Sequence, residues 1–184
     1  MKESVRDFSL KFADIIIAVF LGLGFQWWFD LKEVWQYIAF VFVYIDIIDY
    51  WVDYSPSVKK FPPKAELDLL LNVLIMFALF FYLASTRMTI WYFLGSFASI
   101  RILDYFLLLS MKSGYKPSGK DGVYIDTWLN FNLIYAILTM IFVVVAKFSS
   151  LNPLILLFAF FAYRLTLRIW SSVKYKSVFF SKNI

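Results

Sequence analysis

The stretch that decides the fold is Phe12-Ala13-Asp14-Ile15-Ile16-Ile17-Ala18-Val19-Phe20-Leu21-Gly22-Leu23-Gly24-Phe25-Gln26. It is apolar apart from Asp14 near its start and Gln26 at its end, and with its flanks it is long enough to cross a bilayer as a helix, which takes about 20 mostly apolar residues. A carboxylate costs about 2.5–3.5 kcal/mol at the centre of such a helix and less near the interface. We therefore expect Asp14 to face protein or water rather than lipid.

Apolar segments of this kind recur along the chain. Hydrophobic residues make up 62% of the sequence and charged residues 17%, against roughly a half and a quarter in soluble domains. Six segments are long and apolar enough to be placed as membrane spans: 8–29, 33–53, 66–85, 88–110, 123–146 and 153–170. The sequence predicts an all-α, polytopic membrane protein, with six transmembrane helices in three hairpins forming a single domain over residues 1–184.

The basic residues predict the orientation of these helices. They gather on one side of the predicted membrane, at Lys2, Arg6, Lys11, Lys59, Lys60, Lys64, Lys112, Lys116, Lys120, Lys174, Lys176 and Lys182. The short connections on the other side hold Lys32, Arg87 and Lys147. By the positive-inside rule, both termini and the two longer connections, 54–65 and 111–122, are cytoplasmic. Because topology accounts for the net charge of +5, we expect no nucleic-acid partner.

The composition also narrows the chemistry. The chain has no cysteine and no histidine, which excludes disulfides, thiolate catalysis and cysteine-built metal sites and removes the commonest metal ligand. Asp49 and Asp104 could imitate a carboxylate pair that shares a proton. However, the Gly-x-Gly-Asp context of intramembrane aspartyl proteases is missing, as is a glycine-rich phosphate loop. We expect no enzymatic activity, no metal site and no cofactor.

Charged residues form a belt at the predicted cytoplasmic ends of the segments. Asp14, Asp68 and Asp126 lie in the first turns of outgoing helices, where the positive end of the helix dipole favours a carboxylate. The C-terminal end of a helix favours a cation, and the returning helices carry Arg101, Arg164 and Arg168 near that end.

Asp46, Asp49 and Asp53 do not follow this rule, because they lie at a helix C-terminus, the unfavourable end for anions. Their i, i+3, i+7 spacing places them on one face of the second segment. We expect some of them to need cationic or hydrogen-bonding partners. Asp104 lies near the corresponding end of the fourth segment.

Two interpretations of the belt stay open. In the structural one, Asp14, Asp68 and Asp126 pair with the arginines and with Asn72 and Asn130, which locks the inner end of the bundle. In the functional one, part of the belt, drawn from Asp46, Asp49, Asp53 and their neighbours, forms an acidic vestibule that concentrates cations before a pore.

The first segment carries a stripe that suits a pore wall. Ala18, Gly22 and Gln26 follow Asp14 at i+4 intervals, with Val19 and Leu23 beside them. The spacing of Ala18 and Gly22 also allows two helices to pack closely, which is the structural alternative. The amide of Gln26 suits a pore mouth, and rings of Val19 and Leu23 could gate conduction by dewetting.

These residues resemble a known family, the prokaryotic and lysosomal potassium-leak channels of transmembrane protein 175 type. Its first helix opens with Arg-x-x-x-Phe-Ser-Asp before an apolar run with small residues, and this chain has Phe12-Ala13-Asp14 before Ile15–Gly22. The tryptophan that ends the family's second helix is similar to Trp51, and the asparagine that opens its third helix is similar to Asn72. The chain departs from the motif at Phe8, where the family has arginine, at Ala13, where it has serine, and at Gly22, where it has a hydroxyl residue.

The resemblance implies a homotetramer in the plasma membrane of a prokaryote, with one central pore lined by the first helix of each subunit. It implies a narrowest ring at Val19, with Leu23 next and Gln26 beyond it. Phe12, Asp14, Trp51 and Asn72 would form the packing core that holds the pore helix.

Two functions follow as hypotheses. The first is a passive cation channel, permeable to potassium, whose partners are monovalent cations and the lipid bilayer. The alternative is an ion- or proton-coupled secondary transporter that uses its membrane carboxylates as ion sites, with Asp49 and Asp126 as the side chains to test.

Overall fold

The computed structural model describes residues 2–179, with side chains described for residues 9–174. All of its regular elements are helical within that range. They are α1 Lys2–Phe25, the short 3-10 helix η1 Gln26–Asp30, α2 Val34–Lys60, α3 Glu66–Ser85, α4 Ile90–Tyr115, α5 Gly119–Phe148 and α6 Pro153–Phe179. The predicted all-α class is confirmed.

Side chains at the helix termini explain several of these boundaries. The Oε1 atom of Gln36 accepts the backbone N–H groups of Lys32 and Glu33, at 2.8 and 3.0 Å, and so caps α2. Asp68 caps α3 in the same way, because its Oδ2 atom accepts the N–H groups of Lys64 and Ala65 at 2.9 and 3.0 Å. These bonds satisfy donors that a helix start otherwise leaves unpaired.

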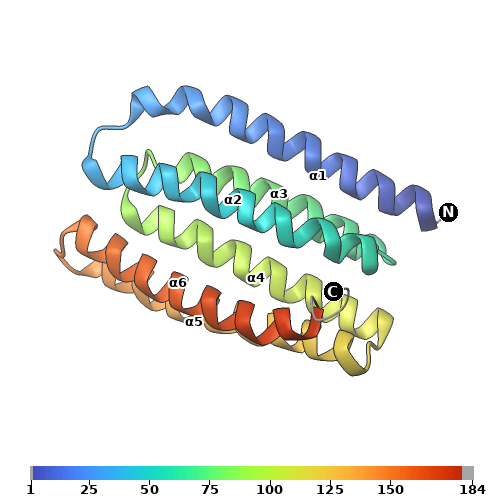
Figure 1. Ribbon diagram of the computed structural model, residues 1–184. Coiled ribbons are helices and arrows are strands. Elements are labelled where there is room, and N and C mark those ends of the chain that lie inside the picture. The colour runs from blue at the N-terminus through green and yellow to red at the C-terminus, as the bar shows by residue number, and fades with distance from the viewer. Residues whose placement is uncertain (1, 180–184) are drawn as a thin grey trace.

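The helices run in alternating directions and form one elongated bundle (Figure 1). The α1–α2, α3–α4 and α5–α6 connections lie at one end of the bundle, and the N-terminus of α1 and the C-terminal end of α6 lie at the other. α4 occupies the middle, packed chiefly against α3 and α5, whereas α1 lies at the edge and contacts α2 and α3.

The bundle core is built largely from aromatic side chains. Tyr82, Phe93, Phe97, Tyr135 and Phe160 are fully buried. Phe97 and Phe160 meet edge to face with ring centroids 5.1 Å apart, and Tyr82 stacks on Phe93 at 5.2 Å. These large rings fix α3, α4, α5 and α6 relative to one another.

Among the described residues, five helical segments are long and apolar enough to cross a membrane: Ser9–Asp30, Glu66–Ser85, Ile90–Tyr115, Gly119–Phe148 and Pro153–Lys174. These apolar helices indicate a membrane-embedded chain. α2 is not among the five, and it carries Asp46, Asp49 and Asp53 in its second half. The sixth span therefore stays a prediction.

The expectation of two long connections was wrong. α2 continues through Pro56 to Lys60, and α4 continues through Gly114 to Tyr115, so that only residues 61–65 and 116–118 remain between helices. The buried side chains of Tyr54 and Val58 hold the last turns of α2 against the bundle. Tertiary packing here outweighs the local tendency of proline to end a helix.

Candidate functional site

α1 has two different faces. Ala13, Ile17, Phe20 and Gly24 are buried, and their i, i+4, i+7, i+11 spacing forms one stripe against α2 and α3. At Gly24 a Cβ atom would lie 2.3 Å from Cδ2 of Leu83. The glycine therefore permits the close approach of α1 to α3.

The stripe predicted as a pore wall lies on the opposite face. Ala18, Val19, Gly22, Leu23 and Gln26 are all exposed, Val19 to 44% and Leu23 to 48%. A Cβ atom at Gly22 would meet nothing within 4 Å in the described part of the chain. We call these five residues the α1 surface stripe; the helices of its own chain do not cover it, so they do not use the Ala18–Gly22 packing motif.

Hydrogen bonds tie α1 to α2 and α2 to α3 at the residues that carry the family resemblance. The indole Nε1 of Trp51 donates to Oδ1 of Asp14 at 2.8 Å. One turn further along α2, the hydroxyl of Tyr54 donates to Oδ1 of Asn72 at 3.1 Å. Phe12 packs half-buried against the apolar core. Asp14 thus anchors α1 to its neighbour, and Tyr54 is a member of this network that the sequence analysis did not identify.

The structural interpretation of the belt, in which Asp14, Asp68 and Asp126 pair with the arginines, is wrong for the described residues. Asp68 caps α3 and accepts a hydrogen bond from the Ser110 hydroxyl. Asp126 pairs with Lys112 at 2.8 Å, with both side chains about half exposed, a setting in which an ion pair contributes about 0–1 kcal/mol. Asn130 is exposed on α5. The start of α3 and Ser110 thus satisfy Asp68, and Lys112 pairs with Asp126.

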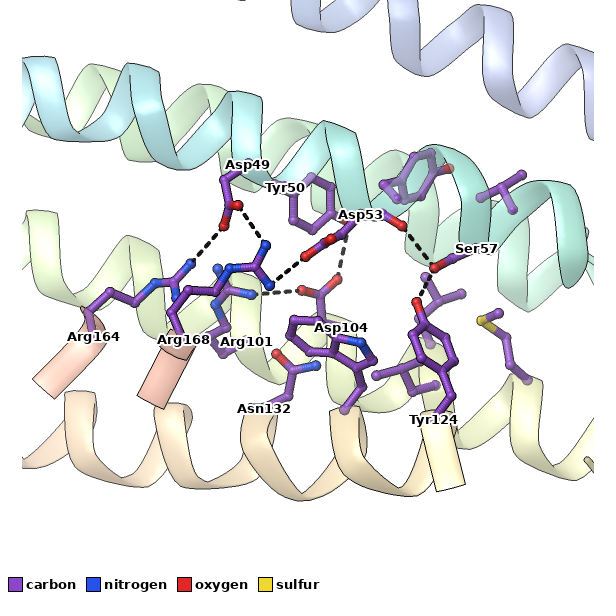
Figure 2. A pocket seen from close by; sticks show the side chains of 16 residues that line it. Asp49, Tyr50, Asp53, Ser57, Arg101, Asp104, Tyr124, Asn132, Arg164 and Arg168 are labelled. Atoms are coloured by element: carbon purple, nitrogen blue, oxygen red, sulfur yellow. Dashed lines mark hydrogen bonds and ion pairs between the residues drawn. The ribbon is translucent and has the colours of Figure 1, made fainter. Parts of the chain in front are cut away.

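The arginines pair instead with the carboxylates of α2 (Figure 2). Nη2 of Arg164 lies 2.6 Å from Oδ1 of Asp46. On α6, one turn further, Arg168 reaches Asp49 through Nη2 at 2.6 Å and Asp53 through Nη1 at 2.7 Å. The i, i+3, i+7 spacing on α2 therefore matches an i, i+4 pair on α6.

Arg101 and Asp104 of α4 complete this group. Arg101 lies 3.8 Å from Asp46 and 3.5 Å from Asp104, and Asp104 also accepts a hydrogen bond from the Tyr50 hydroxyl at 3.1 Å. We call the whole group the ion-pair cluster: Asp46, Asp49, Asp53, Arg101, Asp104, Arg164 and Arg168. Every carboxylate in it has a guanidinium within 3.8 Å, which is the arrangement that makes buried charge tolerable.

A cavity of about 90 Å³ opens beside the ion-pair cluster, between α2, α4, α5 and α6. It has room for a few water-sized groups. Asn132 of α5 lines it with 2% of its surface exposed, and within the described residues its Oδ1 atom has no hydrogen-bond partner. Asn132 and Tyr50 were not identified from sequence; a polar side chain inside an apolar segment was the available signal for Asn132.

No group of three or more acidic residues within the described part of the chain is arranged to hold a metal ion. Comparisons of the chain with protein-family models, curated proteins and solved structures find no match. The features that bear on function are the α1 surface stripe and the ion-pair cluster.

Proposed function

We propose that the protein is a passive cation channel, permeable to potassium, in which four copies surround a central pore lined by the α1 surface stripe. The observation that supports this most is the orientation of α1. The residues that the resemblance assigns to the pore lie on the face that the chain's own helices leave uncovered, as a helix facing a symmetry axis requires.

The attachment of α1 also supports the proposal. The helix is fixed along one side by Ala13, Ile17, Phe20 and Gly24 and at one end by the Asp14–Trp51 hydrogen bond. A pore-lining helix has to keep its constriction in place although only the face turned away from the pore packs against other helices. In the proposed pore, Val19 forms the narrowest ring, Leu23 the next and Gln26 the mouth, and the apolar rings gate conduction by dewetting.

The ion-pair cluster supports a membrane crossing by α2 as the sixth span. An unpaired carboxylate in a lipid-embedded helix is costly, but Arg164 and Arg168 neutralise the aspartates of α2 from the adjacent helix. In this proposal all six helices cross the plasma membrane of a prokaryotic cell. Both termini then face the cytoplasm, where the basic residues lie.

Potassium flux from liposomes that contain the reconstituted protein tests the proposal. We expect flux above that of empty vesicles, and altered flux for Val19→Asn and Leu23→Asn, because a polar ring removes the dewetting barrier. Leu133→Asn is the matched control, since Leu133 on α5 is exposed to 42% beside 48% for Leu23. Tetramers without flux, or an equal effect of Leu133→Asn, would contradict the channel.

The cavity beside Asp49 is the observation that favours the alternative, a coupled secondary transporter. That function predicts saturable, gradient-driven exchange, abolished by Asp49→Asn in a protein that still folds. Asp126 suits the role less well than its place in the sequence indicates, because it is half exposed and paired with Lys112. Flux that rises linearly with ion concentration would favour the channel over the transporter.

A further inference from the structure

The cavity beside the ion-pair cluster contains a buried acceptor with no donor. Asn132 is 2% exposed, and Figure 2 shows its amide directed from α5 toward the charged side chains of α2 and α4. Its Oδ1 atom has no hydrogen-bond partner within the described part of the chain. A buried carbonyl oxygen without a partner is rare in folded proteins, so such an atom calls for a ligand or an ordered water.

The same cavity is lined by the carboxylate with the weakest cationic contact of the ion-pair cluster. Asp46, Asp49 and Asp53 each have a guanidinium nitrogen at 2.6–2.7 Å. Asp104 has Arg101 at 3.5 Å, while Arg101 is shared with Asp46 at 3.8 Å. Asp104 is 8% exposed, so water does little to offset this deficit.

The formal charges of the cluster point to the kind of ligand. Its four aspartates and three arginines leave one negative charge in excess when all are ionised. Three arginines also line the cavity, and Nε of Arg101 and Nε of Arg164 have no hydrogen-bond partner within the described residues. The Nη atoms of Arg164 and Arg168 are held by close contacts to α2. Carboxylate and amide carbonyl oxygens are among the ligands that hard cations prefer.

We propose that this cavity binds one monovalent metal cation, Na⁺ or K⁺, through Asn132 Oδ1 and the carboxylate of Asp104. The bound ion supplies the charge that Arg101 leaves unbalanced and joins α4 to α5. The site is separate from the proposed pore, since the residues that line the cavity come from α2, α4, α5 and α6 and none from α1. Cation binding in this cavity therefore does not depend on whether the protein conducts ions.

Thermal unfolding of the purified full-length chain in detergent micelles tests the site. Na⁺ or K⁺ chloride replaces N-methyl-D-glucamine chloride at constant ionic strength, and tryptophan fluorescence, to which Trp128 at the cavity contributes, reports unfolding. We expect a saturable rise in Tm of roughly 3–6 °C at a cation concentration about ten times the dissociation constant. Tm values that are the same in alkali and N-methyl-D-glucamine chloride would overturn the proposal and indicate a water-filled cavity or a protonated Asp104.

Variants assign the effect to this cavity. Asn132→Leu removes the acceptor while keeping the branched shape of the side chain, and is expected to abolish the cation-dependent rise. Asn130→Leu is the matched control, two residues away on the exposed face of α5, and keeps the rise, as does Val19→Asn on the α1 surface stripe. An Asn132→Leu protein that retains the full rise would overturn the proposal.

Equilibrium binding of radioactive Na⁺ and Rb⁺ to the wild-type chain covers the case in which Asn132→Leu does not fold. We expect one ion to bind saturably per chain. Asp104→Asn is expected to lower the affinity at least about tenfold, because losing a charged ligand in a buried site costs much binding free energy. Asp126→Asn, at the surface pair with Lys112, is expected to bind as the wild type does. No saturable binding to the wild type would refute the site.

Discussion

Replacing Arg164 by methionine tests whether the ion-pair cluster holds α2 to α6. The Arg164 side chain is 6% exposed and pairs with Asp46, itself 8% exposed, at 2.6 Å. It also lies 3.6 Å from Asp49 and donates to the Tyr135 hydroxyl at 3.0 Å. Methionine keeps much of the volume but leaves Asp46 buried with only Arg101, at 3.8 Å.

The magnitude follows from burial. Breaking a buried pair by removal of one partner costs about 3–5 kcal/mol, because a charge is left uncompensated. For a chain of this size, each kcal/mol lowers Tm by roughly 2–4 °C, so the loss in Tm is roughly 6–20 °C. Lys112→Met is the control, since Lys112 and Asp126 are about half exposed and such pairs contribute about 0–1 kcal/mol.

The assay is thermal unfolding of both variants in the same detergent, followed by circular dichroism at helical wavelengths. The double variant Asp46→Leu/Arg164→Met adds a second criterion, because it removes both charges of the closest pair and is expected to recover part of the loss. An Arg164→Met protein that unfolds within about 1 kcal/mol of Lys112→Met would refute the reasoning and show that water reaches the cluster.

Three further predictions concern single contacts, each measured by the same unfolding assay. Gly24→Ala is expected to destabilise the protein by about 1–3 kcal/mol, because the new Cβ would lie 2.3 Å from Leu83 Cδ2. Gly22→Ala has open space around it and is expected to stabilise the protein by about 0.5–1 kcal/mol through helix propensity. Equal effects of the two substitutions would contradict the assigned orientation of α1. Tyr50→Phe removes the hydroxyl that donates to buried Asp104 and is expected to cost about 1–3 kcal/mol, whereas Tyr92→Phe, on the exposed surface of α4, serves as the control and changes little. Trp51→Phe removes the donor to Asp14 and is expected to lower the stability by about 0.5–1.5 kcal/mol. If the double variant Trp51→Phe/Asp14→Asn loses the sum of the two single losses, the two side chains do not act as a pair.

The residues of α1 show what could be predicted from the sequence. Residues at i+4 intervals share a face of any helix, so Ala18, Gly22 and Gln26 had to lie together. The apolar composition likewise predicted the all-helical class, since in lipid a helix satisfies its own backbone. Which way the stripe faces was not determined by spacing and came from the packing of α1 on α2 and α3.

The partners of the aspartates show what could not be predicted. Local rules place a carboxylate at a helix start and a cation at its end, and they account for Asp68 as a cap. The pairing of Asp46 with Arg164 depends on how α2 packs against α6, and these residues are 118 positions apart. The sequence shows Asn132 as a polar residue in an apolar segment, but its burial without a hydrogen-bond partner for Oδ1 is visible only in the structure.

The continuation of α2 past Pro56 has a similar cause. Proline and nearby charges at 54–65 favour a loop when only neighbouring residues are considered. Tyr54 and Val58 face the core, and Ser57 hydrogen-bonds with Tyr124 of α5. Those tertiary contacts outweigh the local propensity for a loop. They cannot be seen when residues 54–65 are considered alone.

The most direct test of the pore is the water accessibility of the α1 surface stripe. Because the chain has no cysteine, Val19→Cys introduces a single reactive thiol, and a charged, membrane-impermeant thiol reagent reports whether water reaches it in the reconstituted protein. We predict that Val19→Cys is modified and that its potassium flux falls, while Leu133→Cys, on the exposed apolar face of α5, is protected by lipid. A Val19→Cys protein that is as unreactive as Leu133→Cys would contradict a pore lined by α1.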